Sequence, residues 1–133
     1  MAEMHRGKRF TVVHCPGALD DLKCLLVNEP EGKRRSLIHG IFVAIKRLSD
    51  GQLMTRETFR KEGELPRQTG RSNGHFFCLK KQPIRGYCWL SKKYPTTYYI
   101  SHYILKRKDK LQKVDTAKVH KNWMLIEDCG DEH

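Results

Sequence analysis

The residues with the clearest chemical potential lie between His75 and Lys113. This segment carries ten Lys and Arg residues against a single Asp, and it holds eight of the twelve aromatic residues in the chain. Cations can contact phosphates and aromatic rings can stack on bases, so the combination is typical of a nucleic-acid surface. The alternative is that the rings are core residues of strands and the cations a solvated face. Composition alone leaves both interpretations open.

The same residue types can also cut RNA without a metal ion. In that reaction the ribose 2′-OH attacks the adjacent phosphate, while one group takes its proton and a second protonates the leaving 5′-oxygen. Cations stabilise the negative charge that develops on phosphorus, and a well-placed donor contributes about 3–4 kcal/mol. A lysine among other cations has a lowered pKa and can serve as the base.

Three successive strands are predicted to position these residues. The segments "HFFCLKK", "IRGYCWL" and "TTYYISHYIL" are separated by linkers short enough for hairpins. Arg85, Tyr87 and Trp89 alternate along the second segment and therefore share one face. Arg85 is expected to be exposed on that face, so its removal should change stability little. In the third segment, alternation predicts His102 on the core face, where a histidine is more typical of a packed structural residue than of a catalyst.

The opposite face of this sheet is predicted to be open, with Tyr99 and Tyr103 standing on it. Further cations lie on the neighbouring strands and directly after the last one. They are Lys80, Lys81, Lys106, Arg107, Lys108 and Lys110. These cations and the aromatic rings of the three strands are predicted to line one concave basic surface. The alternative is that the cations form an ordinary charged end of a hairpin.

The remaining segments predict one further strand and three helices. "RFTVVHC" reads as a first strand, and two apolar stripes indicate helices over 18–29 and 33–49 that form a hairpin. Gly51 suits a left-handed cap at the end of the second helix. A closing helix begins at Asp115 as its N-cap and buries Val119, Trp123 and Ile126. The stretch 52–74 has no clear period.

This order predicts an α+β domain with a small antiparallel or mixed sheet. The two-helix hairpin would cover one face, and a helix would close the chain. We expect a single domain over residues 9–128, between a flexible N-terminus (1–8) and a frayed C-terminus (129–133).

The net charge of the chain favours an acidic partner. The 133 residues carry a formal net charge of +11, which favours nucleic acid, an anionic membrane surface or an acidic protein. The five cysteines form no C-x-x-C pair, and the seven histidines show no metal spacing. No run has the length or apolarity of a membrane span, and no apolar signal region follows the basic N-terminus. We therefore expect a cytoplasmic protein that does not enter a membrane.

Three of these motifs resemble a known family. The elements "FFCLKK", "IRGYCW" and "ISHYILKR" agree in order and spacing, over about forty residues, with the RelE/ParE superfamily of bacterial toxins, and most closely with its HigB-like, phage-derived branch. The resemblance implies a RelE-like fold and a metal-independent, ribosome-dependent mRNA endoribonuclease of a type II toxin-antitoxin system, without a cofactor. It further implies mRNA, the ribosome and a cognate antitoxin protein as partners.

The resemblance also suggests roles for individual residues. Arg85 matches the family's arginine and is predicted to hold the scissile phosphate. Lys80 and Lys81 match the basic end of the preceding strand, where either can hold phosphate or assist proton transfer. Lys106 and Arg107 match the terminal basic pair, which is expected to contact RNA.

The chain departs from the family pattern near its C-terminus. Many ribonuclease members have a catalytic tyrosine or histidine there, and the closing helix offers only His120. His120 is therefore the candidate general acid or base, and the alternative is that it is an ordinary solvated residue of the helix. Two other functions therefore remain open: a non-catalytic nucleic-acid-binding module, and a protein of the same fold that targets DNA gyrase.

Overall fold

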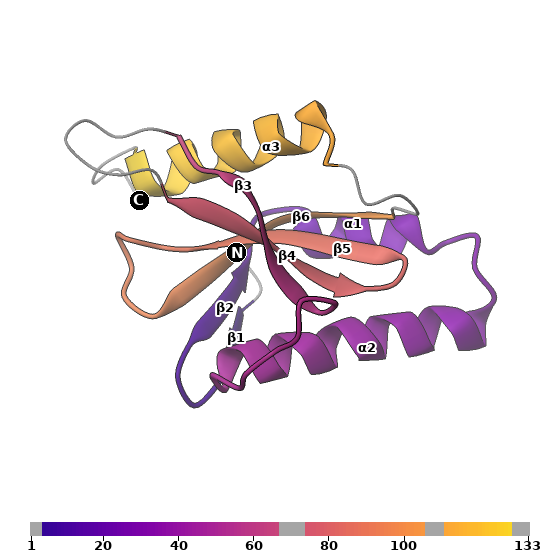
Figure 1. The fold of residues 1–133 in the computed structure, drawn as a ribbon. Helices are drawn as coiled ribbons and strands as arrows, with labels where there is room; N and C mark the ends of the chain where they lie inside the picture. Colours follow the sequence, from indigo (N-terminus) through magenta and orange to yellow (C-terminus); the bar gives the residue numbers. More distant parts are fainter. Residues whose placement is uncertain (1–3, 67–73, 106–110, 129–133) are drawn as a thin grey trace.

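The computed structural model describes residues 4–66, 74–105 and 111–128 (Figure 1). Its elements in chain order are β1 (Met4–Arg6), β2 (Thr11–His14), α1 (Ala18–Leu25), α2 (Glu31–Ser49), β3 (Phe59–Glu64), β4 (His75–Lys81), β5 (Ile84–Leu90), β6 (Thr97–Leu105), α3 (Lys113–Trp123) and η1 (Met124–Asp128), a short π-helical segment that continues α3. The predicted α+β class is confirmed.

The six strands form one open sheet in the order β1-β2-β6-β5-β4-β3. All neighbouring strands are antiparallel except β2 and β6, which run parallel with Thr11 opposite Thr97. The sheet is therefore mixed. The two hairpins β4-β5 and β5-β6 form its centre, as their short linkers predicted.

One face of the sheet is covered by α1 and α2, as the helix stripes predicted. Leu22 of α1 and Ile41 and Ile45 of α2 are fully buried against this face. They meet Ile84 and Ile100 from the central strands in one apolar cluster. Gly51 follows α2 with a φ of 73°, the left-handed conformation that its position after the helix predicted.

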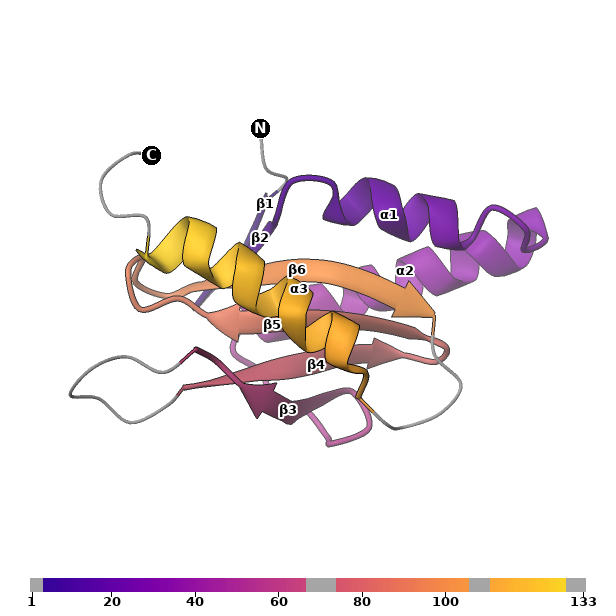
Figure 2. The same ribbon diagram turned by 90° about the horizontal axis from the view of Figure 1, so that it is seen from above.

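The other face is covered by α3, so the prediction of an open face is wrong. Figure 1 shows α3 and α2 on opposite sides of the sheet, and Figure 2 shows α3 lying across the central strands. Val119 and Trp123 are buried in a second apolar cluster with Phe76, Tyr87 and Trp89 from the sheet. The apolar stripe of α3 was predicted correctly, but the surface against which it packs was not.

Both sheet edges contain strands that the sequence analysis missed. Met4–Arg6 was assigned to a flexible N-terminus, yet it forms β1 along β2. Phe59–Glu64, in the stretch without a period, forms β3 along β4 with a register shift between Lys61 and Gly63. Charged side chains and a bulge hide the alternation of such edge strands.

A bulge in β6 changes which side chains face α3. Tyr87 lies opposite His102, whereas Cys88 lies opposite Ile100, so Ser101 is the extra residue. Beyond this point the alternation of β6 is reversed relative to a regular strand. His102 therefore faces α3 and Tyr103 faces α1 and α2, the opposite of the faces predicted for them.

The docking of α3 gives a direct test of this two-sided sheet. We expect Trp123→Ala to lower the free energy of unfolding by about 3–5 kcal/mol, because a buried indole is lost from the second cluster. The matched variant Met124→Ala removes the neighbouring side chain, which is 47% exposed, and should change stability by less than about 0.5 kcal/mol. Urea denaturation measures both. Equal, small effects would mean that α3 does not cover the sheet.

Candidate functional site

Two of the predicted site cations form a cross-strand pair. Lys80 on β4 lies directly opposite Arg85 on β5, and residues opposite each other share a face of the sheet. The next pair on this face is Cys78 and Tyr87, and Tyr87 in turn lies opposite His102 on β6. The structure thus gathers cations, a phenol and an imidazole on the face that α3 covers.

Arg85 is fully buried, which contradicts the prediction of an exposed strand arginine. The reason is the covering of this face, which encloses Arg85 together with the core residues around it. Lys80 on the neighbouring strand is half-buried. Tyr87 is also fully buried, and its hydroxyl has no hydrogen-bond partner in the part of the chain that the structure describes. Burial is the main cause that raises the pKa of Tyr87 above its ordinary value.

The structure distinguishes Lys80 from Lys81. Lys81 points to the opposite face, where its aliphatic stem lies against α2. A Cβ atom added at Gly40 would come within 2.6 Å of the Lys81 Cε atom, which shows how closely this side chain lies along the helix. Lys81 therefore does not join Arg85. The four remaining predicted cations, Lys106, Arg107, Lys108 and Lys110, lie outside the described residues.

Most of the rings predicted on an open face are packed inside the protein. Trp89 is fully buried and donates a hydrogen bond from Nε1 to Glu127 at 3.2 Å. Tyr103 is buried on the α1 and α2 face, where its hydroxyl and His14 Nε2 share a hydrogen bond of 2.6 Å. Tyr99 is half-buried and stacks on Trp89. The predicted open position is wrong for Tyr103, and Tyr99 is only partly exposed. Contact of these rings with RNA stays a prediction.

His120 connects α3 to the edge of the sheet. Its Nε2–H donates a hydrogen bond of 2.7 Å to the backbone carbonyl oxygen of Glu64 on β3. This contact gives His120 a structural partner. A role as general acid or base stays a prediction.

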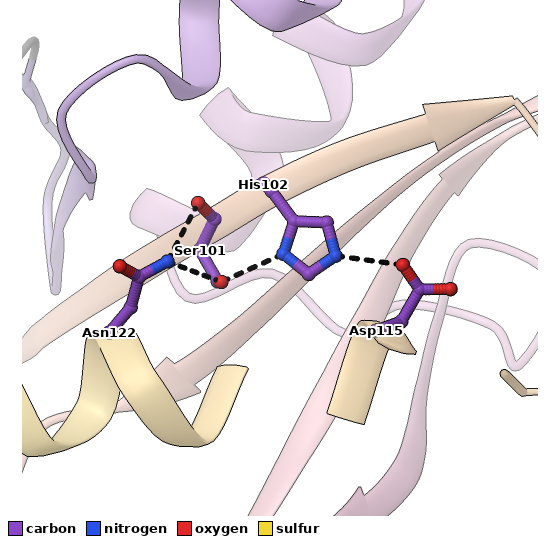
Figure 3. A network of polar contacts seen from close by, with 4 residues as sticks. All are labelled: Ser101, His102, Asp115 and Asn122. Atoms are coloured by element: carbon purple, nitrogen blue, oxygen red, sulfur yellow. Dashed lines mark hydrogen bonds and ion pairs between the residues drawn. The ribbon is translucent and has the colours of Figure 1, made fainter. Parts of the chain in front are cut away.

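Beside these candidates, a chain of polar side chains runs between β6 and α3 (Figure 3). His102 Nε2 lies 3.0 Å from Asp115 Oδ1, and His102 Nδ1 lies 2.8 Å from Ser101 Oγ. Asn122 Nδ2 donates to Ser101 Oγ at 2.8 Å and to the Ser101 carbonyl oxygen at 3.3 Å. Ser101, His102 and Asp115 are at most 4% exposed, so water does not compete for these bonds.

One assignment of protons satisfies the whole chain. The Asn122 amide donates to Ser101, the Ser101 hydroxyl donates to Nδ1 of a neutral His102, and Nε2–H donates to the Asp115 carboxylate. The pKa of His102 agrees with this assignment. Burial lowers it below the ordinary value of 6.5, and the Asp115 hydrogen bond offsets part of that effect. Both ring nitrogens are occupied, which supports the predicted structural role of His102.

Sequence reasoning missed Ser101, Asp115 and Asn122 as members of this network. Asp115 was predicted as the N-cap of the closing helix, but the N-cap is Gln112 and Asp115 lies buried in the first turn. The bulge at Ser101 brings the adjacent His102 to this face, and no local pattern in the sequence signals that bulge. One signal for this network was available in the sequence. Asp115 and Asn122 lie two turns apart on a helix that also has an apolar stripe, so both can face the sheet.

Comparisons with protein families, curated proteins and solved structures gave no match for this chain. The described helices include none with the length and apolarity to cross a membrane. Within the same residues, no group of three or more His, Cys, Asp or Glu side chains is arranged to hold a metal ion. The function must therefore be argued from the site itself.

The burial of Arg85 reverses the effect expected from its removal. We expect Arg85→Ala to lower the free energy of unfolding by about 2–5 kcal/mol, because a large enclosed side chain and its polar contacts are lost. Arg47→Ala removes an exposed arginine from α2 and should have an effect below about 0.5 kcal/mol. Denaturation midpoints compare the two variants. An unaltered midpoint for Arg85→Ala would show that this side chain is not enclosed.

His102 should make stability depend on pH. Its folded-state pKa lies below 6.5, so the folded protein binds fewer protons at this residue than the unfolded chain. The free energy of unfolding should therefore fall as the pH drops from about 7.5 to 5.5, with at most about 1.4 kcal/mol per pH unit from His102. His102→Gln should reduce that slope, and His39→Gln, which removes an exposed histidine of α2, is the control. An equal slope in His102→Gln would refute the assignment.

Proposed function

We propose that the protein acts on RNA and, in the finer form of the proposal, that it is a toxin-like, ribosome-dependent mRNA endoribonuclease with a cognate antitoxin. The observation that supports cleavage is the cluster on the α3 face: Lys80 beside Arg85, with Tyr87 and His102 on the same face. These are residue types that metal-independent RNA cleavage uses. The proposal places the protein in the cytoplasm, where ribosomes are.

Each member of the cluster has a chemical task in this proposal. Arg85 holds the scissile phosphate, because a guanidinium can make two parallel hydrogen bonds to phosphate oxygens. Lys80 stabilises the developing charge or takes the 2′-OH proton. Tyr87 supplies a hydroxyl with no hydrogen-bond partner among the described residues. His102 maintains the geometry through Asp115 and Ser101.

Cleavage by this cluster requires that RNA reach its side chains, and the folded structure encloses most of them. Arg85 and Tyr87 have no exposed surface, so a phosphate cannot contact them while α3 is docked on the sheet. The proposal therefore requires the cover of this face to move when RNA binds. The buried Trp123 and the contact between His102 and Asp115 oppose that movement.

A second candidate is RNA binding without cleavage, and the distribution of charge favours it. Several carboxylates are engaged within the protein: Asp115 with His102, Glu62 with Arg60, Asp50 with Lys46, and Glu127 with backbone and side-chain donors. The cations of α3 instead face solvent. They are Lys113, Lys118 and Lys121. Such solvent-facing cations can contact phosphates without the enclosed cluster.

The matched pair Lys80 and Lys81 tests cleavage. In a translating extract, primer extension should detect cuts within the translated frame. Lys80→Gln should reduce the cutting rate by about tenfold or more, because a cation near the phosphate is lost. Lys81→Gln makes the same chemical change on the opposite face and should cut like the wild type. Arg85→Met, which keeps much of the side-chain volume, tests the phosphate contact once its folding is confirmed.

The outcomes separate the two candidates. Cuts that disappear without ribosomes and weaken only in Lys80→Gln and Arg85→Met support the endoribonuclease. Equal cutting by both lysine variants would remove the cluster as the active site. If nothing is cut but the protein binds RNA with an affinity that falls steeply with salt, binding alone is the activity.

A further inference from the structure

A cavity of about 390 Å³ lies beside the polar network, away from the pair Lys80 and Arg85. Its walls come from the end of β2, the loop between β5 and β6, and the last turns of the C-terminal helix. Tyr94, Tyr99, Cys15, Asn122, Leu125 and Ile126 are among its lining residues. Leu125 is 48% exposed, so the cavity can be entered from solvent. Its size is within the range of about 300–1,000 Å³ that is typical of small-molecule sites.

Two tyrosine rings give the cavity surfaces for a flat ligand. Tyr94 and Tyr99 have ring centroids 6.1 Å apart and planes inclined by 59°. Tyr99 also stacks on Trp89, with centroids 5.5 Å apart and an angle of 24°. A planar ring that enters the cavity can stack on Tyr99, which is itself stacked on the buried Trp89. Because the Tyr99 ring is already held in place, little conformational entropy is lost when the ligand binds.

Polar groups in the wall are few and oriented. The amide nitrogen of Asn122 is directed at Ser101, and Figure 3 shows its oxygen on the side away from that contact. This oxygen can accept a hydrogen bond from a ligand N–H group. Burial raises the pKa of the Cys15 thiol to about 12, so at neutral pH the thiol is uncharged and forms part of the apolar wall. The wall at Cys15 is therefore uncharged, and the neighbouring lining residue His14 shares a hydrogen bond with Tyr103 through Nε2.

Positive charge lies next to the tyrosines. Lys93 Nζ is 5.6 Å from the centroid of the Tyr94 ring, and Lys92 beside it is exposed. The nearby Glu127 carboxylate accepts hydrogen bonds from Ser91 Oγ and from the backbone N–H groups of Lys92 and Lys93. These contacts fix the loop that carries Tyr94. A neutral planar ring attached to a negatively charged group matches this arrangement of ring faces, acceptor and cation.

We propose that this cavity binds one unstacked base of single-stranded RNA. Tyr94 and Tyr99 contact the face of the base, Asn122 Oδ1 accepts a hydrogen bond from its amino or imino group, and Lys93 contacts the adjoining phosphate. The inference rests on the proposed action on RNA and adds a base-binding site apart from the Arg85 cluster. Stacking on aromatic side chains contributes to single-strand binding whatever the base, so the site anchors the strand without selecting a sequence.

The experiment compares two probes of equal charge. One is an oligoadenylate RNA of about ten nucleotides, and the other is a ribose–phosphate oligomer of equal length without bases. Binding at low salt is followed by tryptophan fluorescence, because Trp89 stacks on Tyr99. We expect the oligoadenylate to bind roughly fivefold or more tightly than the abasic oligomer and to change the emission.

Substitutions then locate the effect. Tyr94→Leu should remove most of the preference for the base-containing probe. Phe10→Leu is the matched control, since Phe10 is also half-buried but packs against Tyr98 on the opposite face of the sheet. Lys93→Gln should weaken binding of both probes by the same factor. Photocrosslinking of a 4-thiouridine oligomer to the unaltered protein should label the peptides that contain Tyr94 or Tyr99, which keeps a test available if Tyr94→Leu does not fold.

The failure of this inference is distinguishable from failure of the proposed function. If both probes bind equally, or if Tyr94→Leu retains the base preference, the cavity does not hold a base while action on RNA still stands. Crosslinks confined to other peptides lead to the same conclusion. If neither probe binds at low salt, both the inference and the proposed action on RNA are overturned.

Discussion

The docking of α3 across the second face of the sheet is the constraint on which the rest of the structure depends. Val119 and Trp123 turn a surface that would otherwise face water into a second core, in which Phe76, Tyr87 and Trp89 are fully buried. The same docking brings Asp115 and Asn122 to β6, and Arg85 is buried on this face of the sheet. At its far end, Glu127 attaches the helix to the loop that carries Tyr94. The polar network and the cavity follow from this one contact, which also covers the face that carries the candidate cluster.

The same packing places carboxylates and lysines of the C-terminal helix in different surroundings. Carboxylates on α3 and η1 serve as internal acceptors, Asp115 for an imidazole and Glu127 for an indole, a hydroxyl and two backbone amides. These bonded carboxylates keep their negative charge, while the lysines of α3 lie outside them and face solvent. Part of the net charge of +11 therefore stands on the solvent side of α3, where a polyanion can contact it.

What could be predicted from the sequence was local in origin. The apolar stripe of α2, the cap at Gly51 and the two central hairpins depend on short-range periodicity and turn residues, and all are present. The pairing of Lys80 with Arg85 followed from one hairpin. The faces of His102 and Tyr103 depended on a bulge at Ser101 that no nearby residue requires. The burial of Arg85 depended on how its face of the sheet is covered, and that is decided by long-range contacts.

The parallel pairing of β2 with β6 has a consequence for the order of assembly. Thr11 near the start of the chain lies beside Thr97 near its end, and β6 is the only strand that connects β1 and β2 to the rest of the sheet within the described residues. During synthesis, which proceeds at about 5–20 residues per second, this amino-terminal pair waits several seconds for its neighbour. Closing so long a loop is costly before its contacts repay it. In the nascent chain, β2 therefore lacks its β6 partner for that interval.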